Sequence, residues 1–422
     1  MNVRVYFRSM PNQPGIPVFN LRSLVHGDHL TIDPESRAVL AIKCLAVFEF
    51  VLILATFPLW RGTSAFPQIP LLMALPTAIS LVATVGVMMA CAAIAWLPFQ
   101  DRSQLITKAS ITALLCSIIL VVSNQHRLQS WHWLTMLNLA WLIVLPRKDL
   151  LLAMRHTVAA VYVCSALSRI SLTPEQGISG IIVRQLLELV GQSGWEMADA
   201  SIANLCHLMT LGEFLIGLLL VSPKTQRWGA PGAILLHSSL LLALGPLGLN
   251  HHAGVLLWNL CFLCLVPILF PISRIAENID SAYGPRRGVV LVATWLFPLS
   301  GLFGIADSWP SWQLYSSRPE TWILSVHEAD RKLLPDTVQS FIAEPVPLSE
   351  WCVIKLDRWS LEQTRSPMYP EDRFQRAVIQ SLLAQVPESV RFRVDISEPE
   401  FPFWWQRRER QIDTREDLRE TH

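Results

Sequence analysis

Five ionisable side chains lie within long apolar stretches of this chain, at Glu49, Arg169, His207, Glu213 and His237. A charged group is costly inside a bilayer, so each of these residues is a candidate for function. A carboxyl or imidazole group there could handle protons, or could hold a polar ligand in a cavity between helices. The alternative is that these side chains form hydrogen bonds between neighbouring helices and stabilise their packing.

The positions of these residues along their stretches predict their depths. With a rise of about 1.5 Å per residue, Arg169 and His207 should lie near the outer surface and His237 in the inner half. Glu49 and Glu213 should lie near the middle of the bilayer. A pair between Arg169 and Glu213 would therefore require a long inward reach or a water-filled cleft.

Cys261 and Cys264 have the Cys-x-x-Cys spacing of dithiol–disulfide exchange. Cys261 should lie about 12 Å deep, where a thiolate is poorly solvated and protein partners cannot reach. This favours packing over redox chemistry. Of the 8 cysteines, Cys352 is in the polar tail and the others are in apolar stretches, so we expect no structural disulfide.

Other clusters carry weaker signals. His251 and His252 are adjacent, but no cysteine or carboxylate lies near them in sequence, so we predict an interfacial turn and no metal site. The tail residues from Asp357 to Arg373 show no nucleophile–base pattern. The 16 tryptophans, such as Trp131 and Trp309, are interpreted as anchors at the membrane interface.

The apolar stretches that carry the candidate residues are about the length of a membrane crossing, roughly 20 residues. We predict about nine transmembrane helices. Their ranges are 39–57, 69–97, 105–123, 131–145, 151–170, 203–221, 230–249, 253–272 and 288–306.

The basic residues of the short loops alternate between the two sides of such a bundle. About fifteen Lys and Arg residues fall on one side and about four on the other. This asymmetry predicts a plasma-membrane protein with a cytoplasmic amino terminus and an extracytoplasmic segment after residue 306.

The chain divides into three predicted regions: a cytoplasmic segment 1–38, a transmembrane bundle 39–306 and an extracytoplasmic domain 307–422. The fold class is an all-α polytopic bundle followed by a small α/β or α+β domain. In the outer loop, apolar residues at helical spacing over 178–190 predict an amphipathic helix that lies along the membrane or caps the bundle.

The tail should contain strands over 321–326, 351–356 and 390–396, and helices over 331–341 and 371–385. Residues 406–422 are charged and are expected to be frayed or a solvated helix. The tail is mildly acidic, which excludes nucleic acid as a partner and leaves the lipid bilayer and an exported protein.

Residues 149–270 resemble the DoxX and MauE group of four-helix membrane proteins. The resemblance rests on Ala166–Ile170, on Gly212–Gly217 with the basic turn Pro223–Gly229, and on Gly245–Asn250 with Trp258 and Asn259. It implies a redox-associated role, in quinone-linked sulfur oxidation or in the maturation of disulfide-bearing partners.

The segment Ile32–Leu40 with Phe48 and Glu49 is similar to the opening of HTTM proteins, bacterial relatives of the vitamin K-dependent carboxylase. That resemblance implies a membrane enzyme with an extracytoplasmic domain.

Three functions follow as expectations. The first is a redox-associated accessory membrane protein that binds a quinone or another lipid-soluble molecule near Glu213, Arg169 and His207. The second is a non-enzymatic scaffold whose tail recruits an exported partner, and the third is an HTTM-like membrane enzyme.

Overall fold

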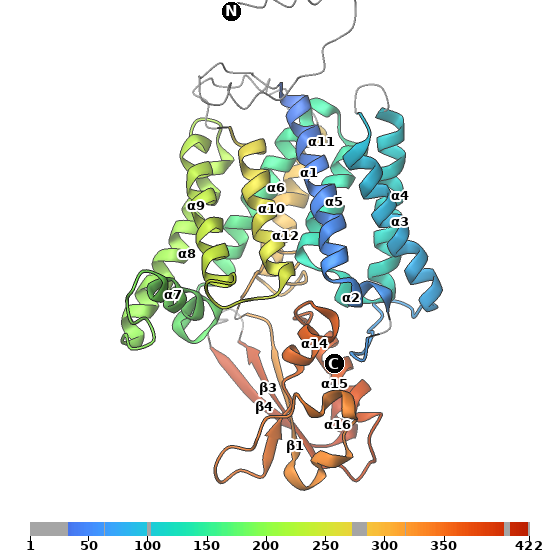
Figure 1. The fold of residues 1–422 in the computed structure, drawn as a ribbon, viewed down its shortest axis with the longest axis vertical. Helices are drawn as coiled ribbons and strands as arrows, with labels where there is room; N and C mark the ends of the chain where they lie inside the picture. The colour runs from blue at the N-terminus through green and yellow to red at the C-terminus, as the bar shows by residue number, and fades with distance from the viewer. Residues whose placement is uncertain are drawn as a thin grey trace, which may run out of the picture. The chain divides into compact units, whose positions relative to one another are not determined.

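The computed structural model describes residues 33–62, 64–98, 103–271, 285–316, 318–400 and 406–420. These residues form a helical bundle followed by a smaller domain with a four-stranded antiparallel sheet (Figure 1). Most of the predicted segment 1–38 lies outside the described residues. Its described part begins at Asp33, and α1 begins at Pro34.

Helices occupy each of the predicted apolar stretches. The bundle contains α1 (Pro34–Ala55), α2 (Phe57–Arg61), α3 (Thr77–Trp96), α4 (Ser103–Ser123), α5 (Ser130–Val144), α6 (Arg147–Ser168), α7 (Ile178–Leu189), α8 (Asp199–Val221), α9 (Gln226–Leu244) and α10 (Ala253–Leu269). It ends with α11 (Pro285–Leu291), a π-helical turn (Val292–Leu296) and α12 (Phe297–Gly301). The short 3₁₀ helices η2 (Gln125–Arg127) and η3 (Pro174–Gln176) lie in loops.

Among the described helices, 5 are long and apolar enough to cross a membrane by length and composition: α1, α3, α4, α6 and α8. The helices in the other predicted stretches are shorter or less apolar, so the count of about nine crossings remains a prediction. The stretch predicted from residue 69 becomes helical only at Thr77, because Pro70 and Pro76 interrupt the segment before it.

Helix α8 shows why the bundle suits a bilayer. Most of its outward side chains from Leu208 onward are leucines, and Leu208 and Leu211 are 64% and 52% exposed. Its buried residues include the small or polar Thr210, Glu213 and Gly217. A helix in water has the opposite arrangement, so the apolar outer surface indicates a lipid environment.

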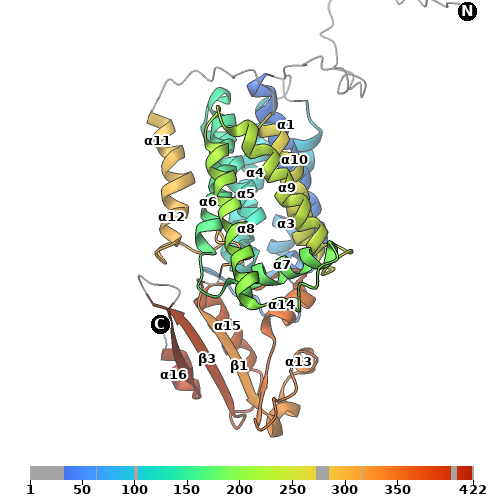
Figure 2. The same ribbon diagram turned by 90° about the vertical axis from the view of Figure 1, so that its left-hand side faces the viewer.

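Helix α6 lies inside the bundle and packs against α8 at very short distance (Figure 2). A Cβ atom on Gly217 of α8 would lie 2.6 Å from Cγ2 of Val163 on α6, so only glycine allows this approach. The contact also fixes the register of the two helices.

The C-terminal domain contains the strands β1 (Thr321–His327), β2 (Trp351–Val353), β3 (Phe392–Pro399) and β4 (Arg407–Ile412), in the sheet order β2-β1-β3-β4. All neighbouring strands are antiparallel, with Leu324 opposite Val394 and Val394 opposite Ile412. The helical elements are η5 (Glu328–Leu333), α13 (Asp336–Gln339), α14 (Leu356–Thr364), α15 (Asp372–Leu383) and α16 (Arg415–Glu420). The buried face of α15, with Phe374 and Val378, packs with the sheet in one core.

The domain is therefore α+β, one of the two classes predicted. The three predicted strands and the helix over 371–385 are confirmed. The predicted helix over 331–341 is present as two short helices, η5 and α13. The expectation of a frayed or helical segment from residue 406 is wrong over Arg407–Ile412, where pairing with β3 turns a charged sequence into an edge strand.

The bundle and the domain share a core. Phe66 and Ile69, from the loop between α2 and α3, are buried within the hydrophobic cluster of the domain. The Phe66 ring lies 4.9 Å from that of Trp359 in α14. Next to it, His126 Nε2 lies 2.8 Å from the carbonyl oxygen of Pro367, and the imidazole is almost fully buried.

Candidate functional site

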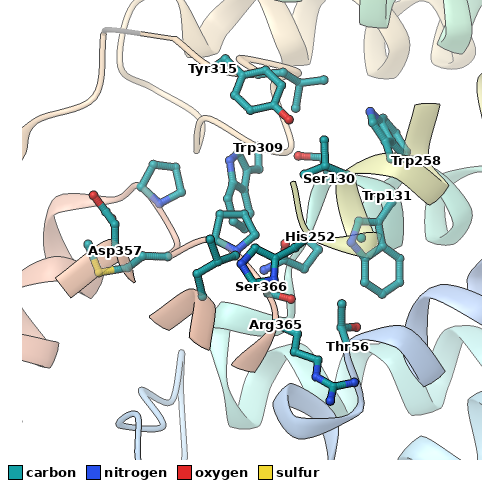
Figure 3. Close-up of a pocket in the computed structure, with 18 of the residues that line it drawn as sticks. Thr56, Ser130, Trp131, His252, Trp258, Trp309, Tyr315, Asp357, Arg365 and Ser366 are labelled. Atoms are coloured by element: carbon teal, nitrogen blue, oxygen red, sulfur yellow. The ribbon is translucent and has the colours of Figure 1, made fainter. Parts of the chain in front are cut away.

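A chamber of about 380 Å³ lies at the end of the bundle that contacts the C-terminal domain (Figure 3). The bundle contributes one wall, with Thr56, Gln129, Ser130, Trp131, His252 and Trp258. The linker after α12 and the domain contribute the opposite wall, with Trp309, Gln313, Tyr315, Asp357, Arg365 and Ser366. The lining is mainly apolar and aromatic with a few polar groups, which is typical of sites for small lipid-soluble molecules.

The ends of three helices place the bundle wall. Thr56 directly follows α1, Ser130 begins α5, and His252 directly precedes α10. Thr56 Oγ1 accepts a hydrogen bond of 2.9 Å from Nε1 of Trp60, which fixes that indole beneath the chamber.

The linker wall is held by charged contacts with α15. Asp307 pairs with Arg373 and accepts a hydrogen bond of 2.6 Å from the hydroxyl group of Tyr369. The backbone N–H of Ser308 donates to the Glu371 carboxylate at 2.7 Å. These contacts fix the linker just before Trp309, which faces the chamber.

Backbone strain is concentrated around this site. Trp312, Tyr315 and Arg365 have φ values of 60°, 56° and 58°, a left-handed conformation that side chains other than glycine rarely adopt. Tyr315 and Arg365 line the chamber, and Trp312 is buried next to it in the linker. Such strain persists where the surrounding structure imposes it, and it is often found at ligand-binding sites.

The pKa values of two ionisable groups of the chamber are raised. Asp357 is accessible to solvent, but the walls around it displace bulk water and raise the pKa of its carboxyl group. Protein atoms crowd the hydroxyl group of Tyr315 and raise its pKa to about 12, against the opposing effect of the Arg169 charge, although the residue is 43% exposed. The described residues contain no group of three His, Cys, Asp or Glu side chains arranged for a metal ion.

Arg169 and Glu213 form a buried ion pair between the end of α6 and α8, with side chains that are each 9% exposed. The expected need for a long reach or a cleft does not arise, because α8 extends well beyond the end of α6. Gly217 faces Val163 in this register, so Glu213 lies level with Arg169. A second cavity of about 220 Å³ lies beside Arg169, and Tyr315 lines both this cavity and the chamber.

The two histidines predicted as ligand-binding candidates have different surroundings. His207 is exposed on α8. It lies six positions before Glu213, so the two side chains point in directions about 120° apart around the helix axis. His237 is buried in α9, where Nε2 lies 2.8 Å from the Tyr162 hydroxyl group and Nδ1 lies 2.9 Å from Oδ1 of Asn259. Both nitrogens of His237 have protein partners, so this residue can hold three helices together without a ligand.

Glu49 has a partner that the sequence did not reveal. Oε1 of Glu49 on α1 lies 2.5 Å from Nδ1 of His132 on α5, and both side chains are 1% exposed. The other oxygen of Glu49 and the other nitrogen of His132 are buried without a hydrogen-bond partner. Such atoms are rare in proteins, because an unsatisfied buried polar group destabilises the fold.

The Cys-x-x-Cys pair does not form one buried site. Cys261 is 2% exposed and its thiol hydrogen-bonds that of Cys44 on α1, whereas Cys264 is exposed on α10. All 8 cysteines are free.

Several tryptophans interpreted as interfacial anchors lie inside the protein. Trp60 and Trp312 are fully buried, and Trp131 and Trp309 line the chamber with 7% and 9% exposure. The interpretation is wrong for these four, because the C-terminal domain and its linker cover this end of the bundle. Sequence reasoning also missed His132, although it lies in the polar start of a predicted helix, between Trp131 and Trp133.

Comparisons with known proteins give no match: no family model, no curated protein and no solved structure matches this chain.

Proposed function

We propose that this chain is an integral membrane protein that binds a lipid-soluble molecule in the chamber between its bundle and its C-terminal domain. A quinone is one member of that class. The DoxX and MauE resemblance further suggests a redox-associated accessory role in the plasma membrane, and this part of the proposal rests on the resemblance alone.

The observation that carries the proposal is the chamber itself. Its volume of about 380 Å³ suits a small ring compound, and the indoles of Trp131, Trp258 and Trp309 offer flat apolar contacts. His252 and Ser130 supply polar groups that could orient the head of such a molecule.

The location near Glu213, Arg169 and His207 that the sequence suggested has less support. Arg169 and Glu213 neutralise each other, and His207 points away from them. We therefore place the site in the chamber, with Tyr315 as its boundary towards Arg169.

The test is binding of a short-chain alkyl benzoquinone and of the matching quinol to the purified protein in lipid nanodiscs, measured by quenching of tryptophan fluorescence. Trp258→Ala should weaken binding about ten-fold, or about 1.4 kcal/mol, because it removes one aromatic wall. Trp228→Ala is the matched control, because Trp228 is 65% exposed on α9 and does not line the chamber.

Equal weakening by both substitutions, or no specific binding, would overturn the proposal. A complete absence of small-molecule binding, including in lipid extracts of the purified protein, would favour the scaffold function. If Glu213→Gln weakened ligand binding and Trp258→Ala did not, the binding site would lie near Glu213 and not in the chamber.

A further inference from the structure

Glu49 and His132 form a buried pair with two unused polar atoms. The close contact between Oε1 and Nδ1 requires one proton between them, which leaves Oε2 of Glu49 and Nε2 of His132 available. The arrangement differs from that of His237, where protein groups satisfy both nitrogens.

The surroundings of the pair are aromatic and contain buried thiols. The His132 ring lies 5.0 Å from the ring of Trp60 and 5.8 Å from that of Trp131. The thiols of Cys91 on α3 and Cys261 on α10 are close enough to Glu49 for an electrostatic interaction with its carboxyl group. The contacts described around the pair supply no hydrogen-bond partner for the two unused atoms, so both are available to a hydroxyl group or a water molecule.

The pair lies close to the chamber, although neither residue lines it. His132 is two residues further into α5 than Ser130, about 3 Å along the helix axis and about 160° around it. Glu49 lies two turns before Thr56 on the same face of α1, about 10 Å away. Trp131 lines the chamber and also contacts His132, so this indole connects the wall of the chamber to the imidazole.

The hydrogen-bonding capacity of the pair selects the partner. With a single shared proton, both unused atoms are acceptors, and a second proton turns one of them into a donor. A hydroxyl group can donate and accept, so it suits the pair in both states. An ether or carbonyl oxygen only accepts, so it donates to neither acceptor of the singly protonated pair, whereas a hydroxyl group donates to one of them.

We propose that Glu49 and His132 form a hydroxyl-recognition site that a movement of the Trp131 indole opens to the chamber, and that the molecule bound there is a lipid-soluble alcohol or phenol. Its hydroxyl group contacts Nε2 of His132, and Glu49 fixes the orientation of the imidazole ring. This inference rests on the proposed function and names the chemical class of its ligand.

The test compares binding of a hexylphenol and its methyl ether to the full chain in nanodiscs, with empty nanodiscs as the correction for partition into lipid. The native protein should prefer the phenol at least ten-fold. His132→Phe should remove the preference and Glu49→Gln should reduce it, whereas the exposed control His207→Phe should leave it unchanged.

A second readout does not depend on the folding of a variant. In native protein labelled with ¹⁵N-histidine, the phenol should shift one imidazole resonance and the ether should not. Glu49→Gln replaces a carboxylate with an amide of the same shape, so it is the conservative variant for this measurement.

The outcomes separate this inference from the proposed function. Binding that falls in Trp258→Ala, with equal affinities for phenol and ether, would overturn hydroxyl recognition and leave the chamber as a binding site, with water satisfying the pair. Binding of neither compound to the native protein would overturn both proposals.

Discussion

At the scale of single residues, the buried polar atoms of the bundle divide by whether protein groups satisfy them. Both ring nitrogens of His237 have partners on neighbouring helices, and Arg169 and Glu213 neutralise each other as an ion pair. These residues suit a structural role, which the sequence left as an alternative. Glu49 and His132 each keep one buried polar atom without a hydrogen-bond partner, and His132 contacts Trp131, which lines the chamber.

The ion pair of Arg169 and Glu213 should be essential for stability. We expect Glu213→Gln to lower the free energy of unfolding by about 3–5 kcal/mol, because it leaves the buried Arg169 cation without its anion. The measurement is the thermal unfolding midpoint of the purified protein.

The double variant Arg169→Gln with Glu213→Gln is the control. It removes both charges and should recover much of the stability lost in Glu213→Gln. If the single variant unfolds at the same temperature as the native protein, the pair has no structural role.

The sequence identified Glu49, Arg169, Glu213 and His237, which the structure places in buried polar contacts. It missed His132 and the fully buried Arg127, which hydrogen-bonds Ser80 and Ser123. Ionisable residues in apolar stretches are visible because their cost in lipid is general. Their partners are not visible, because Glu49 and His132 are 83 positions apart in the chain and meet only through the packing of α1 against α5.

At the scale of elements, the contact between α6 and α8 depends on one glycine. Gly217→Val should destabilise the protein by about 1–3 kcal/mol, because the added side chain would clash with Val163 and its backbone. Loss of this register would also separate Arg169 from Glu213.

Gly212→Ala is the matched control on the same helix, because a Cβ atom there meets nothing within 4 Å. It should be neutral or should stabilise α8 by about 0.5–1 kcal/mol. Thermal unfolding of the two variants in the same detergent distinguishes them, and equal effects would contradict the close packing.

The attachment of the C-terminal domain should depend on pH through His126. Burial lowers the pKa of this imidazole from about 6.5 to about 4, and the hydrogen bond with Pro367 opposes this only in part. The unfolded chain therefore binds more protons than the native protein between these values. The contribution of His126 to the free energy of unfolding is fully present above about pH 6.5. It is lost as the pH falls from there to about 4, and the total loss is about 3 kcal/mol.

The measurement is the free energy of unfolding between pH 7 and pH 4 for the native protein and for His126→Gln. The variant should lose most of the slope in this range, because glutamine does not titrate. His207→Gln, at an exposed position, should keep the slope of the native protein.

The sequence predicted helices and strands correctly where apolar residues recur at a regular spacing. Examples are the helical spacing in α15 and the alternation in β1. The pattern failed for β4, because its charged residues form a strand only through pairing with β3. It also failed to predict α14, a nine-residue helix.

At the scale of the whole molecule, the orientation in the membrane remains a prediction from the basic residues. Fusion of alkaline phosphatase after Glu420 should give an active enzyme in bacterial cells, and fusion of green fluorescent protein at the same point should give none of its fluorescence. The reverse result would place the chamber on the cytoplasmic side.

The shared core at the junction has a consequence for any work on the tail alone. Phe66 and Ile69 complete the interior of the domain but belong to a loop between two helices of the bundle. A fragment that starts at Asp307 would expose the surface that these side chains cover, and it would be prone to bind unrelated proteins or itself. Partners captured with that fragment would bind the surface that the missing loop normally covers, so interaction screens require the intact chain.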